Sequence, residues 1–498
     1  MATIYVSPTG SNTSPYDTWA KAATSLNTAI NAATSDGDVI VCKNVTTHVF
    51  TTTLTTLSAS ITIQNENDDD DYSGTVINVQ GASSIKLLAD GKTITFKGIT
   101  FDGGDSVNYL HTGSSALFRV AAANDFKNCT LTLDHVRITR ITADTSVSSR
   151  VAGILNLTGV TTAVQNTIVL KGCEVDNCWN DVGATGRDYM GTTINNNLKL
   201  VDCYFHDNGV PNTYKTGCII VNQTINDFTP TWQVLGGRFM DTWGGLDAGD
   251  GGVFYFSNSA SAGVKSSLYI EGTYWSGSSA KKGGAFWAGQ NVDCDVVRST
   301  FEDNTAFSYG GGAIGRGGNT YMATELGYSR IVSSVFRRNR AIEGGSGGAV
   351  FVVNVNGRIE IEHCEFENNY STTSGNTLYS QDRAASATVQ LPTLRNSRIY
   401  GDYSQGDGAH ITGENDDGRW QLYDSIIEGG IKAIKDTSAH LENIYDANLD
   451  KYLRALRTVP GRAIGADFQS RTPTWANYDA AGTKWKTLPS IGRYQVLP

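Results

Sequence analysis

The sequence has no long hydrophobic run and no recognisable export signal. None of its 498 residues falls in a stretch approaching 18 consecutive apolar residues, so no transmembrane helix is predicted. After Met1 the chain goes straight into a strand-like segment at residues 3–6, without the charged and apolar regions of a signal peptide. We therefore expect synthesis in a cytosol, with removal of an export signal as the alternative.

The chain also contains fewer basic than acidic residues. The chain has 39 Lys and Arg against 49 Asp and Glu, a formal net charge of −10. This balance argues against a nucleic-acid partner and against an anionic membrane surface. An acidic polysaccharide partner is not excluded, because a local basic patch could be formed by Lys281, Lys282, Arg337, Arg338 and Arg340.

Helical segments are scarce between residues 37 and 440, which contain no Leu- and Ala-rich amphipathic stretch of ten residues or more. A helical solenoid is thereby excluded. The chain contains a different repeat, which is clearest in residues 299–370. Its three copies read Ser299-Thr-Phe301-Glu-Asp-Asn304, Ser334-Val-Phe336-Arg-Arg-Asn339 and Cys364-Glu-Phe366-Glu-Asn-Asn369, and Gly-Gly-Ala motifs follow the first two.

The repeat extends outward from this centre at intervals of 27 to 37 residues. One apolar residue anchors each copy: Phe101, Ile138, Val175, Phe205, Phe239, Tyr274, Phe301, Phe336, Phe366, Ile399 and Ile427. A small residue precedes the anchor by two positions, and Asn follows by three in several copies. Short β-rich runs separated by Gly and Asn predict strands joined by tight turns.

These features predict an all-β right-handed parallel β-helix of about 11 or more coils of ~32 residues. We expect three parts: a strand and capping helix in residues 1–36, the β-helix in 37–445, and a C-terminal cap and tail in 446–498. The capping helix is placed at residues 17–33 with Asp17 as its N-cap. A second short helix is expected at 448–457, and the proline-containing tail from Pro460 is assigned to oligomerisation or docking.

The motifs resemble those of known β-helix families. Phe-x-x-Asn and Gly-Gly-Ala-Ile are similar to repeats of chlamydial polymorphic outer-membrane proteins, and residues 4–10 and 36–41 resemble the start of pectate-lyase-like β-helices. Together the resemblance covers most of residues 1–445. It implies the fold and says little about function, because this fold hosts lyases, glycosidases, adhesins and phage tailspikes.

The eight cysteines are predicted to be free and buried. Cys173, Cys203 and Cys364 occupy the register that Gly or Ser fills in other coils. Interchange of small residues at one register is typical of a tight interior stack and not of disulfides. Free thiols agree with synthesis in a reducing compartment.

Residues 230–290 are rich in aromatic side chains and carboxylates. Aromatic faces flanked by acids suit sugar binding, so we expect this region to contact a polysaccharide and expect Trp243 and Trp275 to be exposed. In the alternative, half of the rings point inward and fill the coil. The predicted carbohydrate-binding residues are Trp243, Trp275, Trp287, Tyr255, Lys281 and Lys282.

Catalysis is neither identified nor excluded. Glycoside hydrolysis needs two carboxyl groups, which adjacent coils can supply. Asp247 and Asp250, each with a residue one coil on, are weak candidates. Asp207 with Asp241 and Glu302 with Glu367 are further formal pairs, and none of these is specific. The motifs of polygalacturonase-like and pectate-lyase-like enzymes are mostly missing, with weak echoes at Asp407–His410 and Ile431–Lys432. We expect no cofactor and no metal; the acidic residues 65–71 are read as a solvated loop, with a Ca²⁺ site as the alternative.

Our functional hypothesis is a phage virion component of the tailspike or fibre kind that recognises host surface polysaccharide. It would be made in the host cytoplasm, form a homotrimer and contact other virion proteins. A polysaccharide lyase or glycosidase is the first alternative. The second is a bacterial surface adhesin whose export signal was removed, which would place the protein outside the cell.

Overall fold

The structure is a computed structural model. It describes residues 1–446 apart from 47, 51–54, 58, 81–83, 88, 105–115, 121–125, 144–152, 158–165, 182–189, 212–214, 227, 246–249, 261–263, 290, 318–327, 355–358, 383–390, 402–405, 414–419 and 436–439. The fold is an all-β parallel β-solenoid of the right-handed type, with only 3% helix, which confirms the predicted fold class. It has about nine turns, slightly fewer than the eleven or more predicted.

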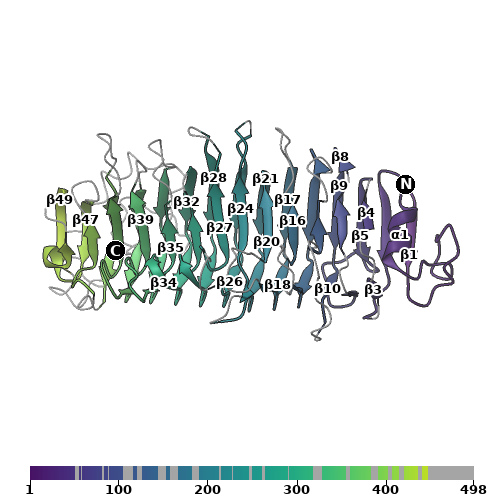
Figure 1. Cartoon of the computed structure of the whole chain (residues 1–498), viewed down its shortest axis with the longest axis horizontal. Helices are drawn as coiled ribbons and strands as arrows, with labels where there is room; N and C mark the ends of the chain where they lie inside the picture. The colour runs from purple at the N-terminus through teal and green to yellow at the C-terminus, as the bar shows by residue number, and fades with distance from the viewer. Residues whose placement is uncertain are drawn as a thin grey trace, which may run out of the picture. The chain divides into compact units, whose positions relative to one another are not determined.

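Contacts divide the chain into two compact units, which we call the N-terminal unit (Met1–Gly249) and the C-terminal unit (Asp250–Pro498). Within each unit, corresponding strands of successive coils pair side by side and form rows (Figure 1). Three rows recur in both units: a long-strand row, a short-strand row and a third row. Alternate side chains of a strand point into and out of the coil, so each row has a buried face and an outer face.

The N-terminal unit contains strands β1 to β26. Its long-strand row is β1 (Thr3–Val6), β2 (Asp38–Cys42), β5 (Ile61–Asn65), β9 (Thr93–Lys97), β13 (Thr130–Asp134), β17 (Asn166–Lys171), β21 (Asn196–Val201) and β25 (Thr231–Leu235). Its short-strand row is β3 (His48–Phe50), β6 (Val76–Val79), β10 (Thr100–Asp102), β14 (Arg137–Thr139), β18 (Glu174–Asp176), β22 (Tyr204–His206) and β26 (Arg238–Met240). Its third row is β4 (Thr55–Leu57), β7 (Ile85–Leu87), β11 (Phe118–Arg119), β16 (Leu155–Leu157), β20 (Gly191–Ile194) and β24 (Ile219–Gln223). Five further strands are β8 (Ala89–Asp90), β12 (Phe126–Lys127), β15 (Thr142–Ala143), β19 (Trp179–Asp181) and β23 (Lys215–Thr216).

The C-terminal unit repeats the three rows and adds a fourth. The long-strand row is β28 (Ser266–Glu271), β32 (Val292–Val297), β36 (Ser329–Val332), β40 (Ile359–Glu362) and β44 (Thr393–Arg395), and the short-strand row is β29 (Tyr274–Ser276), β33 (Thr300–Glu302), β37 (Val335–Arg337), β41 (Glu365–Glu367) and β45 (Arg398–Tyr400). Both continue into β47 (Gln421–Ile427) and β49 (His440–Asp446), which run through the corner. The third row is β27 (Phe254–Asn258), β31 (Phe286–Ala288), β35 (Ile314–Arg316), β39 (Val350–Asn354), β43 (Leu378–Asp382), β46 (Ile411–Gly413) and β48 (Ile434–Lys435), with a 3₁₀ helix at Gly430–Ala433. The fourth row is β30 (Ser279–Lys282), β34 (Thr305–Gly310), β38 (Arg340–Ala341) and β42 (Tyr370–Ser371).

The predicted anchors occupy equivalent register positions on the short-strand row. Phe301 pairs with Phe336, and Phe336 pairs with Phe366. All three rings are fully buried, and successive centroids lie 4.9 Å apart in a parallel stack. In the N-terminal unit the same register joins Phe101, Ile138, Val175, Phe205 and Phe239.

One anchor was wrong by a single residue. Trp275, and not Tyr274, pairs with Phe301 and stacks on it at 6.0 Å. Tyr274 points outward, and its hydroxyl donates to Glu302 Oε2 at 2.8 Å. Since strand side chains alternate, a shift of one residue moves the ring from the surface to the interior. The small residue of this copy is therefore Thr273, whose hydroxyl hydrogen-bonds that of Ser299 at 2.9 Å.

The recurring asparagines form a buried ladder, and the prediction of free, buried cysteines is confirmed. Asn304 Nδ2 donates to Asn339 Oδ1, and Asn339 Nδ2 donates to Asn369 Oδ1, each at 3.0 Å and fully buried. These amides thus stack from coil to coil and also bond corner backbone groups. All eight cysteines are buried and free, and burial raises the pKa of Cys364 to about 12.

The N-terminal helix is shorter than predicted. Helix α1 spans Leu26–Ala32, and its N-cap is Ser25, whose hydroxyl accepts from Thr28 N, and not Asp17. Residues before it are held by the first strand instead: Ala23 forms a β-bridge with Val6. Leu26, Ala29 and Ile30 of α1 are buried. The predicted helix at 448–457 and the tail from Pro460 lie outside the described residues. Among described helices, none is long and apolar enough to cross a membrane.

Candidate functional site

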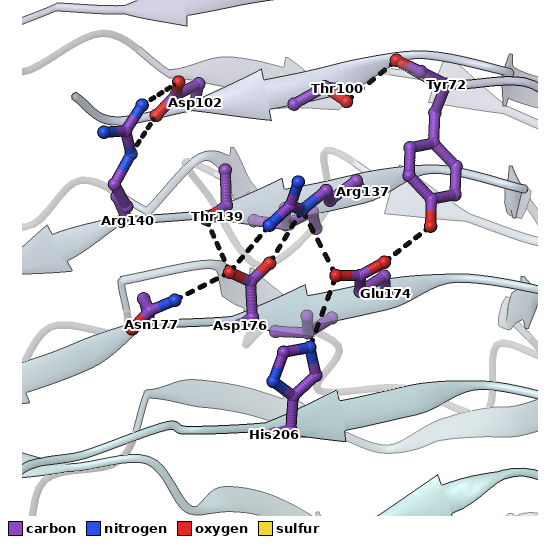
Figure 2. A network of polar contacts seen from close by, with 12 residues as sticks. Tyr72, Thr100, Asp102, Arg137, Thr139, Arg140, Glu174, Asp176, Asn177 and His206 are labelled. Atoms are coloured by element: carbon purple, nitrogen blue, oxygen red, sulfur yellow. Dashed lines mark hydrogen bonds and ion pairs between the residues drawn. The ribbon is translucent and has the colours of Figure 1, made fainter.

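The short-strand row of the N-terminal unit brings charged side chains together on its outer face. Register pairs Arg137 with Glu174 and Glu174 with Tyr204, while Asp176 pairs with His206. These residues alternate with the buried anchors, so their side chains point away from the coil interior. Figure 2 shows that the charged residues of this group, Arg137, Glu174, Asp176 and His206, form one connected network across three coils. We call this group the polar network.

Arg137 and Asp176 form the centre of the polar network. Arg137 Nε and Nη2 lie 2.9 and 3.0 Å from the two carboxylate oxygens of Asp176, whose side chain is almost completely buried (Figure 2). Thr139 Oγ1 and Asn177 Nδ2 donate to the same carboxylate at 2.9 and 2.8 Å. Burial alone raises the pKa of Asp176, but these donors outweigh it and the pKa is below its usual value. Asp176 is therefore a fixed anion with both oxygens occupied.

Glu174 connects this centre to two further groups. Tyr72, from the loop after β5, donates its hydroxyl to Glu174 Oε2 at 2.5 Å. Oε1 lies 3.3 Å from Arg137 Nε and 3.3 Å from His206 Nε2. Burial, and then the bond to Glu174, raise the pKa of Tyr72 to about 12, so this phenol is a hydrogen-bond donor and not a base near neutral pH.

His206 links the interior of the polar network to its exposed edge. Its Nδ1 lies 2.7 Å from Asp207 Oδ2, on the opposite side of the ring from Glu174. The imidazole also stacks on the Tyr204 ring with a centroid distance of 4.0 Å. The ring is thus held by a carboxylate at each nitrogen and by an aromatic face.

Asp207 and Asp241 form the exposed edge. They follow β22 and β26 at equivalent corners, where each adopts a positive φ, +52° and +46°. Both are exposed, in contrast to Asp176. Partial burial, and then the negative charge of Asp207, raise the pKa of Asp241 above its usual value. The polar network therefore ends in two accessible carboxyl groups on successive coils, one of which holds its proton more strongly than usual.

The polar network does not fit a metal ion. Glu174, Asp176 and His206 offer ligand atoms within 4.8 Å of one another. However, Arg137 already neutralises both carboxylates, and a cation would have to displace its guanidinium. A second group of this kind, Asp70, Asp134 and His135, is half open to solvent.

The acidic loop at 65–71 is organised by its own hydrogen bonds. Asn65 Nδ2 donates to Asp69 Oδ1 and to the Asp71 carbonyl, and Lys97 pairs with Asp68 at 2.8 Å. These contacts agree with the predicted solvated loop. The Ca²⁺ alternative stays a prediction.

Trp243 and Trp275 are buried, so the prediction that they are exposed is wrong. Trp275 belongs to the interior ring stack, and its Nε1 donates to Thr273 Oγ1 at 2.7 Å. Trp243 lies at an inner corner, where its backbone N–H donates to the Asn208 carbonyl at 2.8 Å. Neither ring offers a face to a sugar. The alternative that half of the rings point inward also describes Trp232, Phe254, Phe256 and Phe286.

The other predicted binding residues gather in the C-terminal unit. Lys282 Nζ lies 3.1 Å from Asp250 Oδ1 and 5.3 Å from the centroid of the Trp287 ring. Tyr255 packs against the buried cluster that contains Trp287. Lys281, the neighbour of Lys282 on β30, is partly exposed. Asp247, the other weak catalytic candidate, lies outside the described residues.

Sequence reasoning missed most of the polar network. Only Asp207 and Asp241 were named as a pair. Glu174 and His206 carry no motif, and Tyr72 comes from 102 residues before Glu174. The register itself was a usable signal. The residues immediately before and after each anchor are the ones that point outward on this row.

Comparison with known proteins adds little to this description. A scan against models of protein families found no match, and a search of curated proteins found no relative. Among solved structures, a rhamnogalacturonan lyase matches with a TM-score of 0.37 and 13% sequence identity, covering 85% of this chain and 87% of that chain. A likeness of this size does not bear on the site.

Proposed function

We propose that the protein binds a polysaccharide on the outer face of the N-terminal short-strand row and hydrolyses its glycosidic bonds there. One observation carries the proposal: Asp207 and Asp241 are accessible carboxyl groups on successive coils, and the pKa of Asp241 is raised. The usual requirement for this reaction is a pair of carboxyl groups, one of which keeps its proton and acts as the general acid.

The proposed roles follow from the two environments. Asp241 holds its proton and donates it to the leaving glycosidic oxygen. Asp207, held by His206, attacks the anomeric carbon; water then releases the sugar, with Asp241 as base. Neighbouring coils are about 4.8 Å apart, close to the roughly 5 Å carboxyl separation of retaining enzymes. We therefore expect retention of the anomeric configuration.

The polar network has a supporting role in this proposal. Glu174 and Tyr204 hold the His206 ring, and His206 holds Asp207. Arg137 and Tyr72 fix Glu174 in turn. A carboxylate attached to such a chain of contacts loses little rotational freedom when substrate binds, which favours attack.

The experiment is an assay for new reducing ends after incubation with a panel of neutral and acidic bacterial surface polysaccharides. We expect the wild-type chain to cleave at least one, and Asp207→Asn and Asp241→Asn each to lose about 100-fold or more in rate. A product that carries a double bond at its new end would show that the bond is cleaved by elimination and not by hydrolysis. Equal rates for wild type and both variants would remove these carboxylates from the mechanism.

The phage virion role, the homotrimer, the other virion proteins and the host surface polysaccharide as ligand stay predictions. The parallel β-solenoid and the eight buried free thiols support a virion component made in a reducing cytoplasm. The mass of the full chain in solution, measured by light scattering, checks the trimer.

A further inference from the structure

The fourth row of the C-terminal unit contains a distortion that lies beside Lys282. Strands β30 and β34 pair in regular register at Ala280 and Ala306, but Lys282 then pairs with Gly310. One residue on β30 therefore faces three residues on β34, namely Phe307, Ser308 and Tyr309. Such bulges bend a strand and redirect a side chain, and they are frequent beside functional sites.

The bulge is costly to the fold. Tyr309 adopts φ +58°, a left-handed conformation that bulky residues rarely take. The Ser308 hydroxyl is buried and has no hydrogen-bond partner in the described part of the chain. The strand ladder is also interrupted. Because none of these features stabilises the coil, the bulge is better explained by what it presents to solvent.

The bulge presents the aromatic ring of Tyr309 to solvent. Tyr309 is 50% exposed, and it is one of three large apolar side chains in the described residues that are exposed. Lys282 Nζ lies 4.7 Å from the centroid of the Tyr309 ring and 5.3 Å from the centroid of the Trp287 ring. Lys282 is paired with Asp250, and both side chains are more than nine-tenths buried.

The arrangement is that of a supported platform. The Lys282 ammonium attracts the Tyr309 ring by a cation–π contact, and Asp250 and Trp287 fix the ammonium. A ring held in this way keeps its outward side available without losing further side-chain entropy on binding. Flat, preorganised aromatic surface of this kind suits the C–H face of a pyranose.

We infer that Tyr309 is the stacking residue of a separate binding site for a neutral pyranose of a glycan chain, with Lys282, Asp250 and Trp287 as positioning residues. Neutral sugar is favoured because Asp250 already compensates Lys282, so the platform contains no unpaired cation for a uronate. The site lies in the C-terminal unit and does not depend on cleavage at Asp207 and Asp241.

The test is calorimetric titration of the full chain carrying Asp207→Asn and Asp241→Asn, so that no probe is cleaved. Malto-, cello- and galacto-hexaose serve as neutral probes and an oligogalacturonate as the acidic one. The added change is Tyr309→Gly, which removes the ring and suits the positive φ. Tyr309→Phe is the matched control, because it keeps the ring.

We expect at least one neutral probe to bind. Tyr309→Gly should weaken that binding about tenfold or more, or remove one equivalent of it. The affinity of Tyr309→Phe should stay within about twofold of its parent. The unfolding midpoint of Tyr309→Gly should equal or exceed that of its parent. Unchanged affinity in Tyr309→Gly, or binding of the acidic probe alone, would overturn the inference. Failure of cleavage in the wild-type chain would affect only the proposed hydrolysis.

Discussion

The short-strand rows of the two units have the same register but different charge arrangements on their outer faces. In the C-terminal unit, Arg337 Nε lies 2.9 Å from Glu367, and Arg338 binds Asp303 and also Glu302. The charges alternate in sign from coil to coil and form a ladder of ion pairs. In the N-terminal unit, Arg137 compensates the inner carboxylates, but the row then continues to Asp207 and Asp241.

The two rows even share a local motif. A tyrosine hydroxyl donates to a glutamate in each: Tyr72 to Glu174 and Tyr400 to Glu365. Glu365 is buried and lies beside Arg337, whereas Glu174 is partly exposed and contacts His206. The comparison teaches that ion-pair ladders arise wherever opposite charges occupy equivalent positions of successive coils. Departure from charge balance, and not the presence of carboxylates, is what marks a candidate site.

The largest expected effect concerns the corners behind these rows. The Asn339 side chain makes four buried hydrogen bonds in a continuous amide ladder, while that of Asn208 makes two. We expect Asn339→Ala to lower the free energy of unfolding by about 3 to 5 kcal/mol and Asn208→Ala by about 1 to 3 kcal/mol. Chemical denaturation measures both, and equal losses would contradict the difference between the units.

The next effect separates the two arginines. Arg137→Ala leaves the buried Asp176 without its cation, so we expect a loss of about 2 to 4 kcal/mol, discounted for the partial exposure of Arg137. Arg338→Ala removes an exposed pair and should cost about 1 kcal/mol or less. Comparable losses in thermal unfolding would mean that the polar network is an ordinary surface ladder.

The smallest effect is a change in titration. Because the charge of Asp207 helps to raise the pKa of Asp241, Asp207→Asn should lower that pKa toward its usual value. The raised pKa in the folded state means that the contribution of Asp241 to stability is present at low pH and is lost as pH rises through that pKa. Carboxyl-carbon NMR of Asp241 measures the midpoint. A midpoint that stays constant or rises would show that the two groups are not coupled.

The fold was predictable because equivalent positions in successive coils of a solenoid carry similar residues, so the register can be read from the sequence. Phe301, Phe336 and Phe366 recur with flanking small residues and Asn, and this pattern gave both strand position and buried face. Trp275 was misplaced because Tyr274 beside it is also aromatic, and only pairing with Phe301 decides which ring is inside. The length of α1 was predicted wrongly because Ala23 pairs with Val6. Helix propensity is a local property and gives no information about such a contact between distant residues.

The candidate sites were less predictable for a related reason. Tyr72 reaches Glu174 from a loop far earlier in the chain, and Tyr309 becomes exposed only through a bulge in β34. Neither follows from local spacing. The charge pairing of Lys282 with Asp250 likewise depends on two coils lying side by side.

The most direct test of the account compares matched corners in the two rows. Asp241 and Asp303 both follow a short strand at a positive-φ corner, but Asp303 is paired with Arg338. The measurement is the rate of reducing-end release for Asp241→Asn and Asp303→Asn on a polysaccharide that the wild-type chain cleaves. We predict a loss of about 100-fold or more for Asp241→Asn and a rate within about twofold of wild type for Asp303→Asn. Equal rates for the two variants would contradict the claim that chemistry resides where the charge ladder is unbalanced.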